Sequence, residues 1–209
     1  MRALTRGLRA IGNTRGFTMM EVIVVLGVIS VMAAVLTPMV LNYLEDSKVS
    51  KAQSDVKTIA GVILRLHKDI AHPPIYKDGT KTTGSSEIEL LRGPGNNPTE
   101  TDGSNKWLTT ATDKIGELED HLIKNAPGGN KYPTTGRFPW RGPYLEKVSE
   151  DPWGNRYLVN IKNANPADGT PKVVWVISAG ANGKLETDPS SAADSGPNAG
   201  GDDIAIRIK

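Results

Sequence analysis

One carboxylate in this sequence stands where an ionisable group is costly. Glu21 directly precedes residues 22–41, a run of twenty uncharged residues rich in Val, Leu, Ile and Met. An acid within a membrane segment costs up to about 2.5 to 3.5 kcal/mol on insertion scales and usually serves a function. A cut after Gly16 would give Phe17 an α-amino group, a partner for Glu21 of a neighbouring subunit. We therefore predict that Glu21 directs assembly; the alternative is an acid that only reaches the membrane interface.

No constellation in the sequence predicts catalysis. The histidines, His67, His72 and His121, lack metal-ligand spacing and are expected to be solvated. The sequence contains no Cys, which leaves no disulfide framework and no thiolate site. GxSxG, P-loop and dinucleotide-binding patterns are also missing from it. We expect a protein that is not an enzyme.

The apolar run is predicted to cross a membrane. Twenty residues of α-helix, at about 1.5 Å each, span a bilayer core of roughly 30 Å. Residues 1–16 contain four Arg and no acid, which keeps the N-terminus in the cytoplasm and exports the rest. The remaining residues have a net charge of −2, from 21 basic and 23 acidic side chains. We therefore expect no nucleic-acid partner. A plain signal anchor is the alternative.

The same helix is predicted to continue beyond the membrane. Apolar residues recur at spacings of three and four from Val49 to Ile70, which indicates one buried helix face. Pro73 and Pro74 are expected to end this helix of about 50 residues. Pro38, inside it, predicts a kink or local melting because proline lacks the N–H of the helix ladder.

An α+β fold is predicted for the whole chain, with the long helix packed on a small antiparallel sheet. Strand patterns occur at residues 157–161, 172–178 and 203–208, and they suggest a three-stranded meander. A short helix is expected within 113–125, after a long loop region over 77–111. The globular part should contain a single domain.

The N-terminal segment resembles a known family. The letters RG followed by FTMMEVIVVLGVISVMAAVLTP are similar to the leader and first helix of type IV pilins and of the pseudopilins of type II secretion. The resemblance implies a leader over 1–16 that a prepilin peptidase removes after Gly16, with methylation of Phe17. It also implies a transmembrane and assembly helix over 17–44, with Glu21 as the family's assembly acid, and a periplasmic globular domain over 45–209.

Two further segments resemble the major pseudopilin of type II secretion. These are GPYLEKVSEDPWGNRY, residues 142–157, and the Gly- and Asp-rich segment that ends in DDIAIRI. The second resembles a loop that holds Ca²⁺, which implies Asn182, Asp202 and Asp203 as ligands, with Asp188 or Asp194 as substitutes for a missing acid. A merely solvated acidic loop is the alternative. Residues 77–131 are an insertion relative to the family pattern.

The resemblance implies a structural subunit of the periplasmic pseudopilus, which drives export of folded proteins through the type II secretion system. Such a subunit lies in the inner membrane and then in a self-assembled helical filament. Its partners would be minor pseudopilins, the prepilin peptidase and an inner-membrane assembly platform. One alternative is a type IV pilus subunit for adhesion, motility or DNA uptake. Another is a periplasmic binding protein or enzyme that the helix only anchors.

Overall fold

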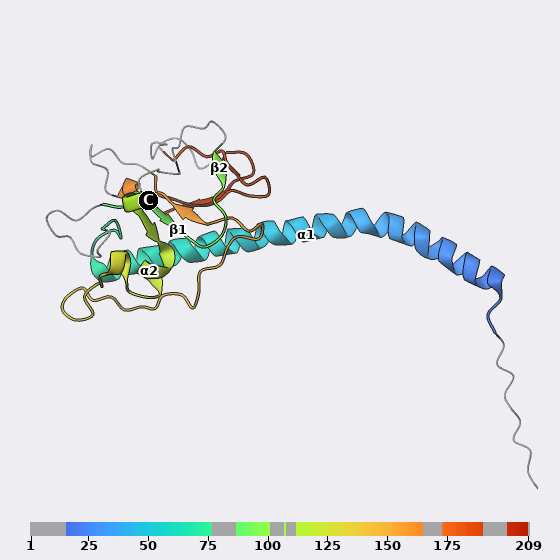
Figure 1. The fold of residues 1–209 in the computed structure, drawn as a ribbon, viewed down its shortest axis with the longest axis horizontal. Coiled ribbons are helices and arrows are strands. Elements are labelled where there is room, and N and C mark those ends of the chain that lie inside the picture. Colours follow the sequence, from blue (N-terminus) through green and yellow to red (C-terminus); the bar gives the residue numbers. More distant parts are fainter. Residues whose placement is uncertain are drawn as a thin grey trace, which may run out of the picture. The chain divides into compact units, whose positions relative to one another are not determined.

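The computed structural model describes residues 16–76, 87–100, 107, 112–164, 173–189 and 200–208. The chain divides into two compact units, Met1–Glu45 and Asp46–Lys209. Helix α1, Met19–Ile70, has 52 residues and contributes to both units (Figure 1). The predicted single long helix is therefore confirmed.

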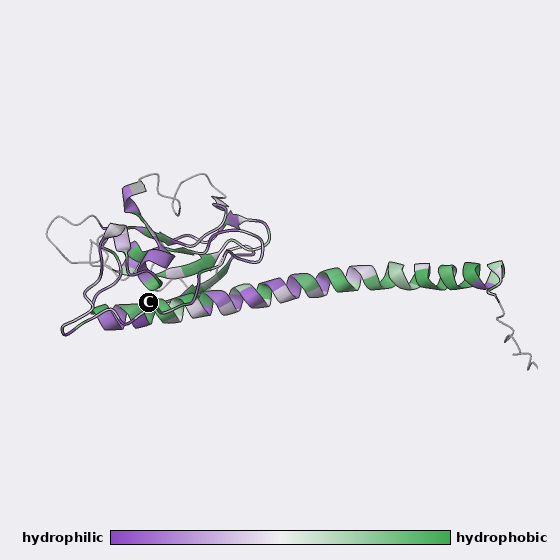
Figure 2. Ribbon diagram, turned by 60° about the horizontal axis from the view of Figure 1, so that its bottom comes forward, coloured by the Kyte–Doolittle hydropathy of each residue, from purple (hydrophilic) through white to green (hydrophobic). Residues whose placement is uncertain are grey.

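The first half of α1 has no buried residue. It is long and apolar enough to cross a membrane, and its apolar side chains from Met19 to Leu44 are exposed. Figure 2 shows hydrophobic residues along this half of the helix. The helix continues through Pro38, so the local melting that the proline suggested is absent. Hydroxyl groups of Ser30 and Thr37 donate to carbonyls four residues earlier, each at 2.7 Å.

The second half of α1 buries the apolar face that its spacing predicted. The buried residues of this face are Ala52, Val56, Ile59, Ala60, Ile63, Leu66 and Ile70. Val49, the first residue of the predicted face, is exposed instead. The helix ends at Ile70, and Ala71 follows with a left-handed φ of 61°. Pro73 and Pro74 follow after His72 and prevent the helix from continuing.

The sheet is mixed and larger than the predicted antiparallel meander, which corrects that expectation. Its spatial order is β3 (Ile115–Glu117), β1 (Leu90–Arg92), β4 (Leu158–Val159), β5 (Trp175–Ser178) and β7 (Ile204–Arg207). The three expected strands are β4, β5 and β7, and they pair antiparallel. Strand β1 adds antiparallel to β4, and β3 adds parallel to β1. The connection over 165–172 lies outside the described residues.

The remaining short elements also differ from expectation. The helix expected within 113–125 is only α2, Leu118–Leu122, because the residues before it form a 3₁₀ turn and strand β3. The expected loop over 77–111 contains β1 and β2, Thr99–Glu100, although 77–86, 101–106 and 108–111 lie outside the described residues. Strand β2 pairs parallel with β6, Lys184–Leu185. Two more 3₁₀ turns occupy Pro127–Gly129 and Ile161–Ala164.

Both faces of the sheet are buried. On one face, Val174 and Val176 pack in a cluster with the buried face of α1. On the other face, Trp175 and Ile177 pack with Leu185 and with Trp107 from a distant segment. Successive strand residues point to opposite faces, which explains why adjacent residues join different clusters. The globular unit therefore holds a sizeable core of its own.

Candidate functional site

Glu21 caps its own helix in this structure. Its carboxylate Oε2 accepts hydrogen bonds from the Thr18 backbone N–H at 3.3 Å and from the Thr18 hydroxyl at 3.4 Å. In return, the Glu21 N–H donates to Thr18 Oγ1 at 3.2 Å. This reciprocal pair is a capping box, which satisfies N–H groups left free at a helix start. The Thr-x-x-Glu pattern of a capping box is visible in the sequence. The prediction for Glu21 considered only its place beside the membrane segment and missed this role.

The residues around the predicted cleavage point are open to other molecules. Phe17 is 85% exposed, and Gly16 has nothing within 4 Å of the place where a Cβ would stand. Glu21 is exposed as well, although it accepts two bonds from Thr18. A second partner for this carboxylate therefore meets no steric obstacle from the described residues.

Asp151 organises a turn in the segment DPWGN, residues 151–155. Its Oδ1 accepts N–H bonds from Trp153 at 3.0 Å and Asn155 at 2.7 Å. Its Oδ2 accepts the hydroxyl of Ser178, at the end of β5, at 2.7 Å. Gly154 has φ +87°, which favours glycine. These bonds form a tight turn, in which Trp153 is half-buried and lies outside both core clusters.

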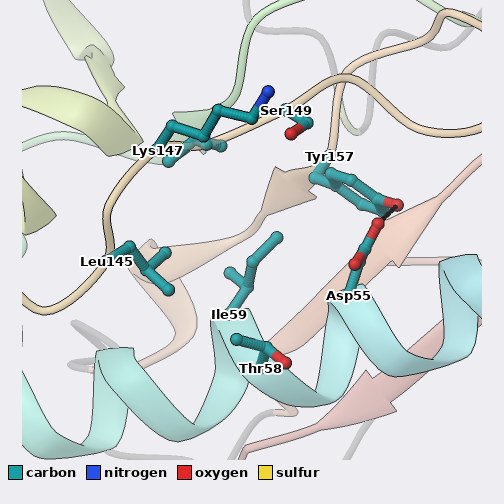
Figure 3. A pocket seen from close by; sticks show the side chains of 8 residues that line it. Asp55, Thr58, Ile59, Leu145, Lys147, Ser149 and Tyr157 are labelled. Atoms are coloured by element: carbon teal, nitrogen blue, oxygen red, sulfur yellow. Dashed lines mark hydrogen bonds between the residues drawn. The ribbon is translucent and has the colours of Figure 1, made fainter.

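Two tyrosines connect the globular unit to the packed half of α1. The Tyr157 hydroxyl donates to Asp55 Oδ2 at 2.9 Å, and the Tyr144 hydroxyl donates to Asp69 Oδ2 at 2.8 Å. Burial and the acceptor carboxylate raise the pKa of both phenols, that of Tyr144 to about 12. Figure 3 shows Tyr157 and Asp55 beside a cavity of about 70 Å³, with Leu145 on another wall. A cavity of this size holds a few waters and no organic ligand.

The predicted calcium residues lie together at the end of the sheet. Asp202 Oδ2 accepts the Asn182 N–H at 2.9 Å, so these two predicted ligands are in contact. Glu186, which sequence reasoning did not assign, also belongs here: its Oε2 accepts the Asp202 N–H at 3.2 Å. Gly201 leaves the space that this carboxylate occupies, because a Cβ at that position would overlap Glu186 Oε2. Asp188 is exposed and Asp194 lies outside the described residues.

Asp203 is the buried member of this group. It is 8% exposed, and its Oδ2 accepts N–H bonds from Glu186 and Thr187 at 2.8 and 2.7 Å. Its Oδ1 is buried without a hydrogen-bond partner. Burial raises the pKa of this carboxyl above its ordinary value, against the effect of its hydrogen bonds. A buried carboxylate oxygen without a partner is a position where a cation would lower the free energy.

The donor chemistry of this loop fits Ca²⁺, which takes six to eight oxygen ligands including amide and main-chain carbonyls. Among the described residues, no three His, Asp or Glu side chains converge closely enough to hold a metal ion by themselves. The oxygen of Asn182 and main-chain carbonyls would therefore have to complete the set around Asp202 and Asp203. Asn182 Oδ1 already accepts the Lys184 N–H at 2.6 Å and keeps a second lone pair.

His121 corrects the expectation of solvated histidines. It is buried, and its Nδ1 forms a hydrogen bond with the Tyr132 hydroxyl at 2.5 Å. Burial lowers the pKa of His121 from 6.5 to about 3, so the ring is neutral at physiological pH. Asn125 supports the same network through two hydrogen bonds with the backbone of Tyr132.

The structure as a whole defines a class: a protein with a long N-terminal helix, apolar on all sides in its first half, and a small α+β unit packed on its second half. Residues 129–194 match the family model described as "Type II secretion system (T2SS), protein G". That match covers the Asp151 turn and the predicted calcium ligand Asn182.

Curated relatives agree with the family match. The chain is 26% identical over 170 residues to the type II secretion system core protein G of Pseudomonas aeruginosa, covering 81% of this chain and 84% of the relative. Against the core protein G of Escherichia coli strain K12 it is 24% identical over 181 residues, covering 87% and 91%. A fimbrial protein of Pseudomonas aeruginosa is 27% identical over 115 residues, covering 54% and 75%. No solved structure gives a significant match. The chain is therefore similar to type II secretion system protein G, as the sequence motifs suggested.

Proposed function

We propose that this protein is the main structural subunit of a periplasmic pseudopilus in a type II secretion system. The observation that carries the proposal is the first half of α1, which is apolar on all sides and wholly exposed, joined to a globular unit that matches protein G. Exposed apolar surface of this extent requires lipid or other subunits around it. The membrane would hold the helix before assembly, and neighbouring helices would hold it in the filament.

Processing at the start of α1 would prepare the subunit for assembly. In this proposal a prepilin peptidase cuts after Gly16, and Phe17 becomes the methylated N-terminal residue. The exposure of both residues supports access by such an enzyme. Glu21 would exchange its bonds from Thr18 for the amino group of a neighbouring Phe17, which would fix the register between subunits.

Calcium would complete the loop at the end of the sheet. Asn182, Asp202 and Asp203 would hold it with help from Glu186, and its charge would offset the cost of the buried Asp203 carboxylate. We expect added Ca²⁺ to raise the unfolding temperature of the protein and added Mg²⁺ to do so less. Asp203→Asn should remove the calcium response, whereas Glu146→Gln, an exposed acid elsewhere, should keep it. An unfolding temperature that is independent of Ca²⁺ contradicts the site.

The function is tested by deleting the gene and comparing proteins in the culture medium with fibres sheared from the cells. We expect exported proteins to remain in the periplasm while any surface pili persist. Secretion that continues without this chain would refute the proposal.

A type IV pilus subunit is the second candidate, because the fimbrial relatives match 115 residues of the chain. The same deletion distinguishes the two functions. Loss of surface fibres with normal secretion would favour the pilus subunit.

A further inference from the structure

A cleft of about 420 Å³ lies where strands β1 and β3 end. These two strands run parallel, so their last residues, Arg92 and Glu117, lie side by side at the same end of the sheet. Residues 93–95 and six charged side chains line the cleft. Its volume falls in the range of roughly 300 to 1,000 Å³ that is typical of ligand sites. The proposed processing, assembly and calcium sites use none of these residues.

Most of the cleft comes from residues 77–131, the predicted insertion. Eight of the nine lining residues, all except Arg156, belong to this segment. The match to the family model begins only at residue 129. The cleft is therefore built mainly outside the part of the chain that matches the family model.

Three of the charged residues, Arg92, Arg156 and Glu117, form a positive cluster. Arg92 Nε donates to Glu117 Oε1 at 2.7 Å, and Arg156 Nη1 lies 4.0 Å from Glu117 Oε2. Two cations and one acid give this cluster a net charge of +1. Within the described residues, the terminal nitrogens of Arg92 donate to no acceptor, and Arg156 Nε is buried without one. The cluster can therefore bind a further carboxylate through the two terminal nitrogens of Arg92.

The other three charged residues, Glu119, Asp120 and Lys124, form a negative cluster. Lys124 Nζ lies 2.9 Å from Glu119 Oε2 and 3.4 Å from Asp120 Oδ1. Two acids and one cation give this cluster a net charge of −1. No ion pair joins the two clusters in the part of the chain that the structure describes. All six side chains are partly exposed, so a ligand can reach charges of both signs in one cleft.

The turn over residues 93–95 is held in one conformation. The Gly93 N–H donates to the Tyr157 carbonyl at 2.9 Å, and the Asn96 N–H donates to the Gly154 carbonyl, also at 2.9 Å. Gly95 has φ +113°, a conformation that favours glycine. A site that is already formed loses little conformational entropy when it binds a ligand.

We propose that this cleft binds a peptide that presents one carboxylate and one ammonium group, the first to the positive cluster and the second to the negative cluster. Two sources have this chemistry: the free ends of a short peptide, and an acidic and a basic side chain of a longer protein segment. A simple anion fits less well because the negative cluster repels it, and an apolar ligand would remove water from unpaired polar atoms. Every lining residue lies in the unit Asp46–Lys209, so binding does not depend on assembly.

Amide NMR of the full-length chain in an uncharged detergent tests the proposal with triglycine, whose free ends carry the two charges. We expect saturable shifts of the Gly93 and Gly95 signals. Blocking one end, as in acetyl-triglycine or triglycine amide, should weaken binding about tenfold because one charge-assisted contact is lost. The peptide acetyl-Lys-Gly-Gly-Glu-amide has both charges on side chains only. If it binds more tightly than triglycine, the source is a protein segment; if more weakly, the source is free chain ends.

Variants assign each end of the peptide to its cluster. Arg92→Gln should weaken acetyl-triglycine binding about tenfold and leave triglycine amide unchanged, because the amide has no carboxylate. Asp120→Asn should do the reverse. The matched control is Arg137→Gln, which changes an exposed arginine outside the cleft and should alter neither peptide's binding. Shifts that do not saturate, or equal effects of Arg92→Gln and Arg137→Gln, would overturn the proposal. Binding of fully blocked triglycine as tightly as the free peptide would also overturn it.

Discussion

The two halves of α1 belong to one continuous helix and yet differ in what surrounds their apolar side chains. The first half exposes all of its apolar side chains, whereas the second half buries one face in the core of the globular unit. The difference lies in periodicity, because residues 22–41 have no polar face while the segment from Val49 to Ile70 has one. A helix with no polar face needs an apolar environment from outside the chain, either lipid or the helices of other subunits.

The largest effect should come from separating the two halves. We predict that a chain beginning at Asp46 folds and stays in solution, because both hydrophobic clusters lie within the described residues after that point. Circular dichroism and cell fractionation measure the outcome, with the full-length chain in the membrane pellet as the control. A truncated chain that is unfolded, or that still pellets with membranes, would contradict this difference between the two halves.

Acid should destabilise the globular half through His121. The folded-state pKa of about 3 lies below the unfolded value of 6.5, so the unfolded chain takes up the proton first. Stability is complete above about pH 6.5 and falls as the pH drops toward 3, by roughly 4 to 5 kcal/mol for this group. Denaturant unfolding at pH 7, 5 and 4 measures the slope.

The control for this slope is His121→Asn, which keeps a polar group near the position of Nδ1. It should lower stability at pH 7 and flatten the dependence on pH. Equal slopes for the natural chain and the variant would show that other groups cause the acid sensitivity.

Two leucines two positions apart distinguish the faces of the packed half. Leu66 is 0% exposed and Leu64 is 47% exposed, on the same helix. Leu66→Ala should cost about 2 to 5 kcal/mol of unfolding free energy, because it leaves a cavity in the core. Leu64→Ala should change it by less than about 0.5 kcal/mol. Chemical denaturation measures both, and similar losses would mean that the helix does not pack as described.

The smallest effect concerns the start of the exposed half. Thr18→Val removes the capping box and should cost about 1 kcal/mol of local helix stability, seen as roughly fivefold faster amide hydrogen exchange in the first turn. Thr37→Val removes a hydroxyl hydrogen bond in the middle of the helix and should leave the exchange rates of the first turn unchanged. Unchanged exchange in both variants would show that Glu21 does not cap the helix.

Periodicity made some elements predictable and left others hidden. The long helix and the strands β4, β5 and β7 carry strong apolar patterns and were found. Strand β1, Leu90–Arg92, has three residues between polar segments, too few to show a period. Ile115, Leu118 and Leu122 have helical spacing, but Ile115 belongs to β3 because its backbone pairs with Leu90 of β1. Such pairing over 25 residues cannot be read from local sequence.

The candidate sites also divide into residues that a local pattern predicts and residues that only the fold brings together. Glu21, Gly16 and Phe17 are predicted as site residues because a local pattern contains them all, although the capping role of Thr18 was missed. Asn182, Asp202 and Asp203 were placed by resemblance, and the structure brings them together across a loop. Glu186 was missed as a member because its approach to Gly201 depends on how two distant segments fold together. The burial of His121 likewise depends on Tyr132 and on the packing around it.

The central claim, that the apolar half of α1 builds a secretion filament, is tested most directly by Glu21→Leu in a strain without the natural gene. Leucine makes the segment more apolar, so the variant should still enter the membrane fraction. We predict that it forms no filaments and that exported proteins remain in the periplasm, whereas the natural gene restores both. Normal filaments and normal secretion by the variant would contradict the account.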